Sequence, residues 1–195
     1  MPHLLDRLSG LLLTIAILGT AIDSVIAAPA AALTDNAAEV VTRGQREAKD
    51  ITYGDWQKLC FKPGGMPMLC RTSITGKFPT GQTAVRIDLI QREDAPTARL
   101  QLFVPVGMYL QQAPKVTIDQ GAPFRVPYTW CATNLCIAAD VAPPKTVEEM
   151  AAGKALTLEL VDSNLLALTT SVPLGQFAGA YKGAPAKTLE QYVEE

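Results

Sequence analysis

The sequence predicts a mainly β protein: a single-domain β-sandwich, or barrel-like antiparallel sheets, with one or two short helices. Apolar residues alternate with charged or polar ones in residues 85–89, and residues 100–104 repeat the pattern. Strands with one buried face show this alternation. Short runs of the same kind recur between Gly and Pro residues, which is typical of sandwiches and barrels. A chain of 195 residues suits one such domain and is too short for several.

Further strands are expected where a short apolar run lies between turn-forming residues. These runs are residues 116–119, 124–130, 135–139, 156–161 and 165–172. Asp162, Ser163 and Asn164 join the last two runs as a hairpin turn, because such residues tolerate left-handed backbone and bond their own main chain.

Two short helices are expected near the end of the domain. Thr146 and Glu149 form a capping box, with Thr146 at the N-cap and Glu149 at the third helical position, and Gly153 is placed to end the helix. This helix has one to two turns. A second short helix is expected over residues 174–181, after Pro173.

Residues 1–32 have the features of a secretory signal peptide. The apolar run over residues 8–22 is about fifteen residues long, whereas a membrane-spanning helix needs roughly 20. Small residues follow it and favour cleavage after Ala30 or Ala32. The first cysteine is Cys60, so no cysteine is placed for lipid attachment. We therefore expect a periplasmic or secreted protein with no integral membrane anchor after cleavage.

The rest of the chain divides into three segments by composition. Residues 33–50 are polar and lack a sustained apolar stripe, which predicts a flexible leader. Residues 51–182 hold the predicted strands and helices and form the β domain. Residues 183–195 are rich in Ala, Lys and Glu and are expected to be a mobile or weakly helical tail.

Charge and histidine content exclude several functions. The formal net charge is -2, which does not supply the basic field that a nucleic-acid-binding protein needs. The sole histidine, His3, leaves with the signal peptide. Without an imidazole, Ser-His-Asp and Cys-His catalysis and histidine-bound zinc hydrolysis are excluded. We expect a protein that is not an enzyme and has no cofactor, although catalysis by carboxylates or lysine stays open.

Four cysteines in an exported chain predict two disulfides. Local pairing joins Cys60 with Cys70 and Cys131 with Cys136, and it closes loops of about 11 and 6 residues. The two crossed pairings close loops of roughly 60 to 80 residues and cost on the order of 2 kcal/mol more for each closure. Local pairing is therefore favoured, although native geometry can override this preference.

Two functional roles for these cysteines compete with the structural one. Thioredoxin-type redox couples use a Cys-x-x-Cys spacing, which neither pair has. Four-cysteine zinc sites have at least one Cys-x2-4-Cys knuckle, to which only Cys131 and Cys136 come close. Structural disulfides, each stabilising the fold by roughly 2–3 kcal/mol, are the preferred interpretation, and no metal site is expected.

Two strand carboxylates are candidates for an acid and base pair. Asp88 and Glu159 lie in predicted strands, and paired carboxylates catalyse glycoside hydrolysis. Their positions alternate with those of Leu89 and Leu158, so both are expected on the solvent side of the sheets. We interpret them as solvated surface residues.

Tryptophans and arginines are the remaining candidates for ligand contact. Trp56 and Trp130 are possible platforms for sugar rings, but each lies within four residues of a cysteine, which favours a core ring packed on a disulfide. Arg86, Arg92 and Arg99 fall on neighbouring strands, where nearby acidic residues neutralise them. No ligand-binding residue is assigned from these patterns.

Several short motifs follow one another in a distinctive order along the chain. The series is Tyr53-Gly54-Asp55-Trp56, Cys60 and Cys70, Val104-Pro105-Val106-Gly107-Met108, Lys115-Val116-Thr117-Ile118-Asp119, Pro123-Phe124, Cys131 and Cys136, and Val172-Pro173-Leu174-Gly175-Gln176-Phe177. This ordered series resembles the invasion-associated locus B family of exported bacterial proteins, and the resemblance covers roughly residues 51–182. Family members often have a glycine just before the fourth cysteine, whereas this chain has Asn134-Leu135-Cys136, so the tight turn is expected to rest on Asn134.

The resemblance implies a periplasmic or surface-associated β-sandwich related to proteins that take part in host-cell invasion. It carries no catalytic residues. We expect a non-enzymatic binding or interaction module whose partner is an unknown protein or envelope component. The alternatives are a chaperone-like or envelope stress factor that binds strand edges, or a carboxylate-dependent hydrolase.

Overall fold

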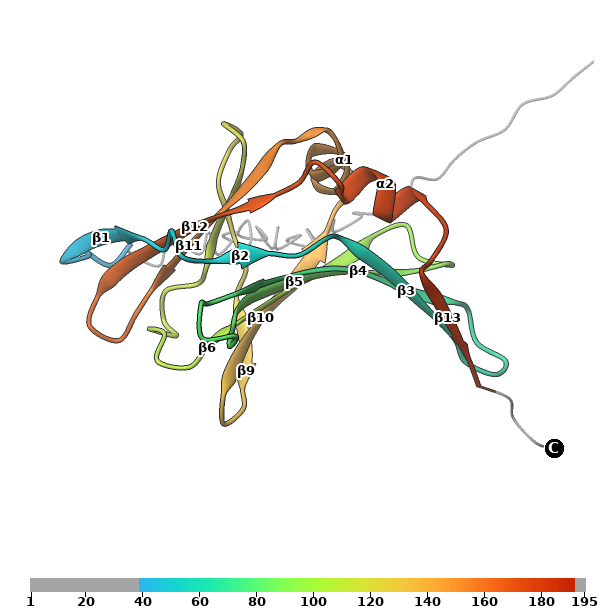
Figure 1. The fold of residues 1–195 in the computed structure, drawn as a ribbon, viewed down its shortest axis with the longest axis horizontal. Helices are drawn as coiled ribbons and strands as arrows, with labels where there is room; N and C mark the ends of the chain where they lie inside the picture. Colours follow the sequence, from blue (N-terminus) through green and yellow to red (C-terminus); the bar gives the residue numbers. More distant parts are fainter. Residues whose placement is uncertain (1–38, 192–195) are drawn as a thin grey trace, which may run out of the picture. The chain divides into compact units, whose positions relative to one another are not determined.

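Two β-sheets and two short helices make up residues 39–191, the part of the chain that the computed structural model describes (Figure 1). The expected signal peptide at residues 1–32 lies outside these residues. The strands are β1 (Gly44–Glu47), β2 (Thr52–Tyr53), β3 (Gln57–Lys62), β4 (Leu69–Lys77), β5 (Thr83–Arg92), β6 (Ala98–Pro105), β7 (Lys115–Ile118), β8 (Phe124–Arg125), β9 (Tyr128–Cys131), β10 (Leu135–Ala142), β11 (Ala155–Val161), β12 (Leu166–Pro173) and β13 (Lys187–Glu190). The helices are α1 (Pro144–Ala152) and α2 (Phe177–Lys182).

The predicted mainly β fold with short helices is confirmed. One sheet has five strands in the order β1-β12-β11-β7-β8, and the other has eight, with the path β13-β3-β4-β5-β6-β10-β9 and β2 also paired to β4. Neither sheet closes into a barrel. In Figure 1 the eight-stranded sheet arches, with its convex side toward β11 and β12 and its concave side facing away from them. The concave side is called the outer face below.

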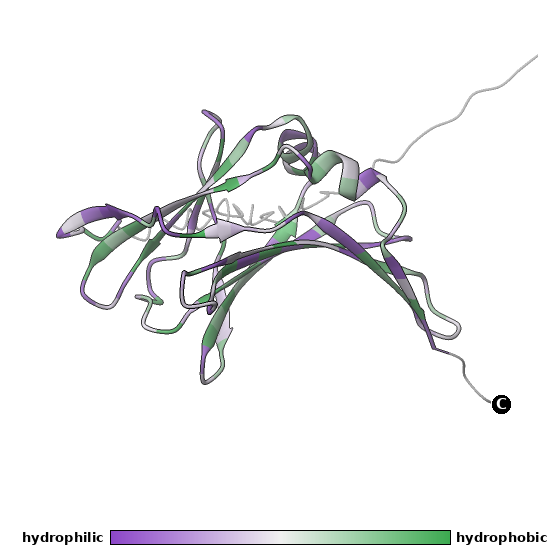
Figure 2. Ribbon diagram, in the orientation of Figure 1, coloured by the Kyte–Doolittle hydropathy of each residue, from purple (hydrophilic) through white to green (hydrophobic). Residues whose placement is uncertain are grey.

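The core lies between the two sheets. Strands of both sheets mix hydrophobic and hydrophilic residues along their length (Figure 2). In β6 and β11 buried positions alternate with more exposed ones, so every second side chain points inward. The inner side chains of β5 and β6, such as Ile87 and Leu102, are completely buried, as are Leu156 and Leu158 of β11. Their burial removes apolar surface from water and holds the two sheets together.

Both ends of the described chain form strands where the sequence suggested none. Residues of the expected flexible leader form β1, which pairs in parallel with β12, and residues of the expected tail form β13, which pairs in parallel with β3. All other pairings are antiparallel. The side chains of β13 are exposed throughout, so main-chain bonds to β3 hold it. Apolar alternation therefore does not reveal such a strand.

The predicted strand over residues 124–130 divides between the two sheets. β8 pairs with β7 in the five-stranded sheet, and β9 pairs with β10 in the eight-stranded sheet. Between them, Val126 is completely buried and Pro127 has no N–H to continue a ladder. The chain thus crosses from one sheet to the other at Pro127, as strands do at the corners of a sandwich.

The N-cap of helix α1 lies three residues before the expected one. Pro143 is the N-cap and Pro144 the first helical residue, and no side chain caps the helix. The fixed φ of proline suits the first helical turn, where its missing N–H costs nothing. Thr146 therefore lies inside the helix and the predicted capping box was wrong. Gly153 is the C-cap as expected, and its N–H donates to the Glu149 carbonyl oxygen. Helix α2 begins at Phe177, three residues after its expected start, and ends at Lys182, one residue after its expected end.

Two motif residues have backbone conformations that explain their identity. Gly107 has φ +88 in the turn after β6, a left-handed conformation that glycine adopts freely. Asp119 has φ 49 at the end of β7, and its carboxylate accepts hydrogen bonds from the N–H groups of Lys154 and Ala155, at 3.0 and 2.9 Å. Asp119 thus holds the start of β11 beside β7. By contrast, the turn at Asn134 needs no left-handed residue, so that expectation was wrong.

Tyr128 of β9 packs against the core with an unsatisfied hydroxyl group. Its Oη is buried and has no hydrogen-bond partner among residues 39–191. An unpaired buried hydroxyl destabilises a fold by about 1–3 kcal/mol. We expect Tyr128→Phe to raise the free energy of unfolding by about 1 kcal/mol in urea titrations at neutral pH.

The same variant tests whether Tyr128 causes a loss of folding stability at alkaline pH. Burial raises the pKa of Tyr128 above its usual value of 10.0, so the folded state keeps the phenol neutral while the unfolded state ionises. The wild-type protein therefore loses stability as the pH rises above about 10. Tyr128→Phe should lose less stability over the same pH range. If the free energy of unfolding falls equally steeply with pH in the two proteins, Tyr128 is not the group that causes the loss. Burial also raises the pKa of Tyr53, so this residue accounts for part of the alkaline loss of stability that remains in the variant.

Candidate functional site

The four cysteines form two disulfides, and no cysteine in the described part of the chain is free. Cys60 pairs with Cys70 across β3 and β4, with Cα atoms 4.0 Å apart, and Cys131 pairs with Cys136 across β9 and β10, with Cα atoms 3.9 Å apart. This is the local pairing. In each case the two cysteines are direct cross-strand partners, so the sheet register alone brings the sulfur atoms together.

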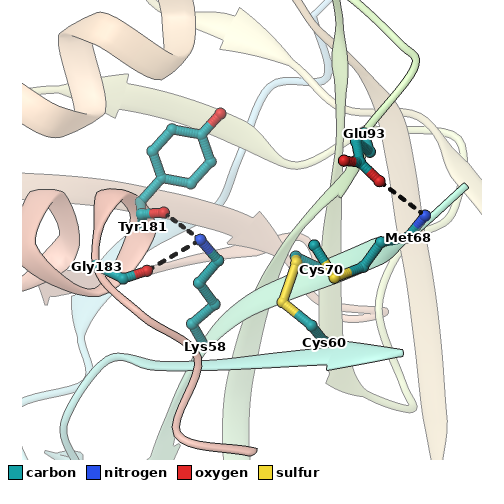
Figure 3. The surroundings of a disulfide bond; sticks show 7 residues. All are labelled: Lys58, Cys60, Met68, Cys70, Glu93, Tyr181 and Gly183. Carbon is teal, nitrogen blue, oxygen red and sulfur yellow. Dashed lines mark hydrogen bonds between the residues drawn. A yellow bond between two sulfur atoms is a disulfide. The ribbon is translucent and has the colours of Figure 1, made fainter. Parts of the chain in front are cut away.

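Two charged side chains beside the first disulfide bind main-chain groups (Figure 3). The Lys58 ammonium donates hydrogen bonds to the carbonyl oxygens of Tyr181 and Gly183, at 2.9 and 3.1 Å, and so satisfies the C-terminal end of α2. Glu93 accepts a bond from the Met68 N–H at 3.3 Å. The charged groups beside this disulfide are therefore occupied by main-chain partners.

Thiol chemistry provides a direct test of the pairing. Protein purified without reductant should show no thiol that reacts with a thiol reagent after unfolding in denaturant, because all four sulfur atoms are paired. Exchange of both Cys131 and Cys136 for alanine should lower the free energy of unfolding by about 2 kcal/mol, from the entropy of a loop of about six residues. Detection of two or more thiols in the unreduced protein would rule out the assignment.

The two candidate carboxylates are not brought together. Asp88 lies on β5 of the eight-stranded sheet, whereas Glu159 lies on β11 of the five-stranded sheet and pairs with Lys115 at 2.7 Å. The expectation that Asp88 is solvated was wrong, because its exposed fraction is only 1%. These two residues therefore do not form an acid and base pair in one cleft. Within residues 39–191 no group of three or more His, Cys, Asp or Glu side chains is placed to hold a metal ion.

The two tryptophans differ in their environments. Trp56 is buried as expected, with 6% of its surface exposed. Trp130 is 56% exposed, so the expectation of a core ring was wrong for this residue. Neighbouring residues in a strand point to opposite faces. Cys131 is itself exposed but is bonded to the core residue Cys136, which leaves its neighbour Trp130 on the outer face opposite Ile137.

Strand register places three rows of side chains across the outer face. The first row is Thr75, Arg86, Phe103, Ile137 and Trp130; the second is Gln57, Ser73, Asp88, Gln101 and Ala139; the third is Leu59, Arg71, Ile90, Arg99 and Val141. Trp130 and Val141 are more than half exposed at the β9–β10 end. The outer face thus combines arginines with exposed apolar groups.

Arg86 is held in place by two neighbours. Its Nε donates to Asp88 Oδ1 at 2.7 Å, and its Nη2 donates to Asp88 Oδ2, which makes a bidentate pair. Its guanidinium carbon lies 4.7 Å from the centre of the Phe103 ring, in a cation–π contact. Arg71 approaches the same carboxylate, with its Nε 3.9 Å from Asp88 Oδ2. Asp88 therefore fixes Arg86 against the sheet while Arg86 keeps 31% of its side-chain surface exposed.

A cavity of about 600 Å³ opens beside Arg86 at one end of the outer face. We call it the Arg86 groove. It is lined by Phe78, Gln82, Thr83, Arg86, Phe103, Val104, Pro105, Val106, Thr133, Asn134 and Leu135. The turn between β4 and β5 and the turn between β9 and β10 supply its rims, and the second disulfide closes the latter turn.

The Arg86 groove has the composition of a ligand site. Such sites are cavities of roughly 300–1,000 Å³ with mainly apolar walls and a few polar groups that fix orientation. Arg86 is the one charged residue among the lining residues. In the sequence, Arg86 is only one of three arginines that nearby acidic residues neutralise. The separation of Arg86 and Asp88 by two residues in a strand was a local signal for a same-face pair, but Phe103 and Leu135 join the site only through register.

Sequence and structure comparisons agree on one family. The family model described as Invasion associated locus B (IalB) protein matches residues 56–185. The chain is similar to the crystal structure of invasion associated protein B from Bartonella henselae, with a TM-score of 0.59 and 23% sequence identity over 67% of this chain and 90% of that one. This likeness concerns the fold. None of the curated proteins is significantly similar in sequence. Because the family match spans more than half of its 195 residues, the chain belongs to the invasion associated locus B family.

Proposed function

We propose that this protein is exported to the bacterial periplasm or surface and acts there as a binding module, and that its partner contacts the Arg86 groove. The observation that carries the proposal is a fixed arginine, backed by a buried carboxylate, in a cavity whose other lining residues are uncharged and mainly apolar. A buried ion pair is not needed to stabilise a sheet surface. A guanidinium held in one orientation is, however, what recognition of a polar group in a ligand requires.

Export is supported by two features. Disulfides persist in oxidising compartments such as the periplasm, and this chain has two. Residues 1–32 have the composition of a signal peptide. No helix in residues 39–191 is long and apolar enough to cross a membrane. The family name and the Bartonella relative suggest a partner encountered during contact with host cells, either in the envelope or on the host surface.

A binding module fits the geometry better than the alternatives do. A chaperone-like factor that adds client strands needs an accessible sheet edge, but the edges here end in strands of two to four residues, β1, β8, β9 and β13. Short edge strands are a protection against strand addition. The hydrolase alternative needs two carboxylates at one cleft, and Asp88 and Glu159 lie in different sheets.

Site-specific crosslinking in living cells tests this proposal. A photoreactive amino acid at Val106, which is 45% exposed in the groove, should give a discrete crosslinked species. The matched control is Leu189 of β13, which is 49% exposed and lies outside the groove. We expect the species at position 106 only, and we expect its loss in the Arg86→Gln/Asp88→Asn double variant. Equal crosslinking at 106 and 189 would contradict the proposal.

A further inference from the structure

The wall of the Arg86 groove favours an apolar ligand group. Phe78, Phe103, Pro105, Val106 and Leu135 contribute side chains to it, and they come from three separate parts of the eight-stranded sheet and its turns. Apolar surface that leaves water on this wall stabilises a complex by roughly 25 cal/mol per Å². The polar lining residues Gln82, Thr83, Thr133 and Asn134 are uncharged. An apolar ligand group can therefore pack against this wall, whereas Arg86 is the one charged lining residue that can pair with an ionic group of the ligand.

The Arg86 guanidinium has donors to spare. A guanidinium carries five N–H groups, and the pair with Asp88 uses one on Nε and one on Nη2. Within the described residues, no other acceptor forms a hydrogen bond to it. About three N–H groups thus remain, and a planar, fixed set of donors matches the two oxygens of a carboxylate.

The net charge of the side chains around Asp88 favours a ligand group that carries a single negative charge. Arg71 and Arg86 both face the Asp88 carboxylate, so this cluster has one positive charge in excess. A carboxylate brings one negative charge and balances the cluster. A phosphate monoester brings about -1.5 to -2 at neutral pH and overcompensates it beside an apolar wall, where an unpaired charge is expensive to bury.

We propose that the Arg86 groove binds a monocarboxylate borne next to an apolar group, with the carboxylate on Arg86 and the apolar group against Phe78, Phe103 and Leu135. This assignment rests on the proposed function and names its ligand chemistry. Two sources offer that chemistry: a free amphiphilic acid, and the C-terminal carboxylate of a polypeptide that ends in an apolar residue. In both cases the ligand supplies the acceptor and the protein supplies all of the donors.

Titration calorimetry with matched acid and neutral probes tests the chemistry. One pair of probes is decanoate and decanol, and the other is a short peptide ending in phenylalanine with either a free or an amidated C-terminus. At least one acid should bind about tenfold or more tightly than its neutral match, and the pair that shows the larger preference identifies the source. If each neutral probe binds as well as its acid, or if no acid binds, the carboxylate assignment is overturned.

Variants separate recognition by Arg86 from a general loss of folding. Arg86→Gln leaves Asp88 buried without its main partner, so the informative variant is Arg86→Gln/Asp88→Asn, in which both charges are removed together. It should keep a cooperative thermal transition and lose the preference for the acid. Arg99→Gln is the matched control, because Arg99 is an exposed arginine of the same sheet outside the groove. It should keep the preference. A folded double variant that still prefers the acid would overturn the proposal.

The two proposals fail in different ways. Crosslinks at Val106 together with equal binding of acid and neutral probes would leave the binding module in place and remove the carboxylate assignment. A clear acid preference without any crosslink at Val106 would support the ligand chemistry and contradict a macromolecular partner at the groove.

Discussion

Replacement of Trp56 by alanine is expected to lower the free energy of unfolding by about 3–5 kcal/mol. Trp56 precedes β3 and is 94% buried, since only 6% of its surface is exposed. Its ring meets the completely buried Phe177 of α2 edge to face, with ring centres 4.9 Å apart. Its Nε1 donates to the Pro173 carbonyl oxygen at 2.7 Å. Loss of the ring therefore leaves a cavity and also an unsatisfied carbonyl group at the end of β12.

Two further variants separate the contribution of the Trp56 ring from that of its Nε1 donor and provide a control. Trp56→Phe keeps an aromatic ring but removes the Nε1 donor, so it should cost less than alanine. Trp130→Ala removes the same side chain from the outer face, where it is 56% exposed, and should change stability by about 0.5 kcal/mol or less. Urea titrations give all three values. A Trp56→Ala protein as stable as Trp130→Ala would mean that Trp56 does not join α2 to the sheets.

The second large effect is expected at Arg86. Arg86→Gln should lower the free energy of unfolding by about 2–4 kcal/mol, because it leaves the Asp88 carboxylate, 1% exposed, without its bidentate partner. Arg71 is too distant, at 3.9 Å, to replace both hydrogen bonds. The Arg86→Gln/Asp88→Asn double variant should regain part of the loss, because it removes the uncompensated charge.

A second arginine in the same strand provides the control for this effect. Arg92 pairs with Asp94 at 2.5 Å, but the two side chains are 53% and 45% exposed. Exposed ion pairs contribute about 0–1 kcal/mol, so Arg92→Gln should have little effect in the same urea titration. If Arg86→Gln were as mild as Arg92→Gln, the buried carboxylate would not depend on Arg86, and the structural basis of the groove would be lost.

The sequence predicted strands whose inward positions are aliphatic, and it missed β3 and β4, whose inward positions also hold polar or small residues. β5 and β6 place Ile87 and Leu102 inward and were found by alternation. β4 lies beside β5 but was missed. Its inward side chains include Thr72, which is 1% exposed, and Gly76, at which an added Cβ would lie 2.6 Å from the Tyr53 ring. Such positions look polar or small, so the period of two is hidden.

Side-chain parity gave the correct face for Asp88 but not its burial. Alternation with Leu89 placed it on the side away from the core, where the structure also has it. The sheet is concave on that side (Figure 1), and the side chains of Arg86 and Arg71 lie against the carboxylate. Curvature depends on all strands of the sheet, and contacts such as Arg86 on Phe103 depend on register between strands. Neither can be predicted from a local pattern.

The two end strands have a practical consequence for handling the protein. β1 and β13 lie outside residues 56–185, the family match, and each covers the border of a longer strand, β12 or β3. Trimming the chain to the family boundaries would expose the unpaired edges of β12 and β3, and exposed strand edges favour self-association. Shortened versions are therefore expected to aggregate at concentrations at which the longer chain remains in solution. Affinity tags are better attached through a spacer beyond residue 191.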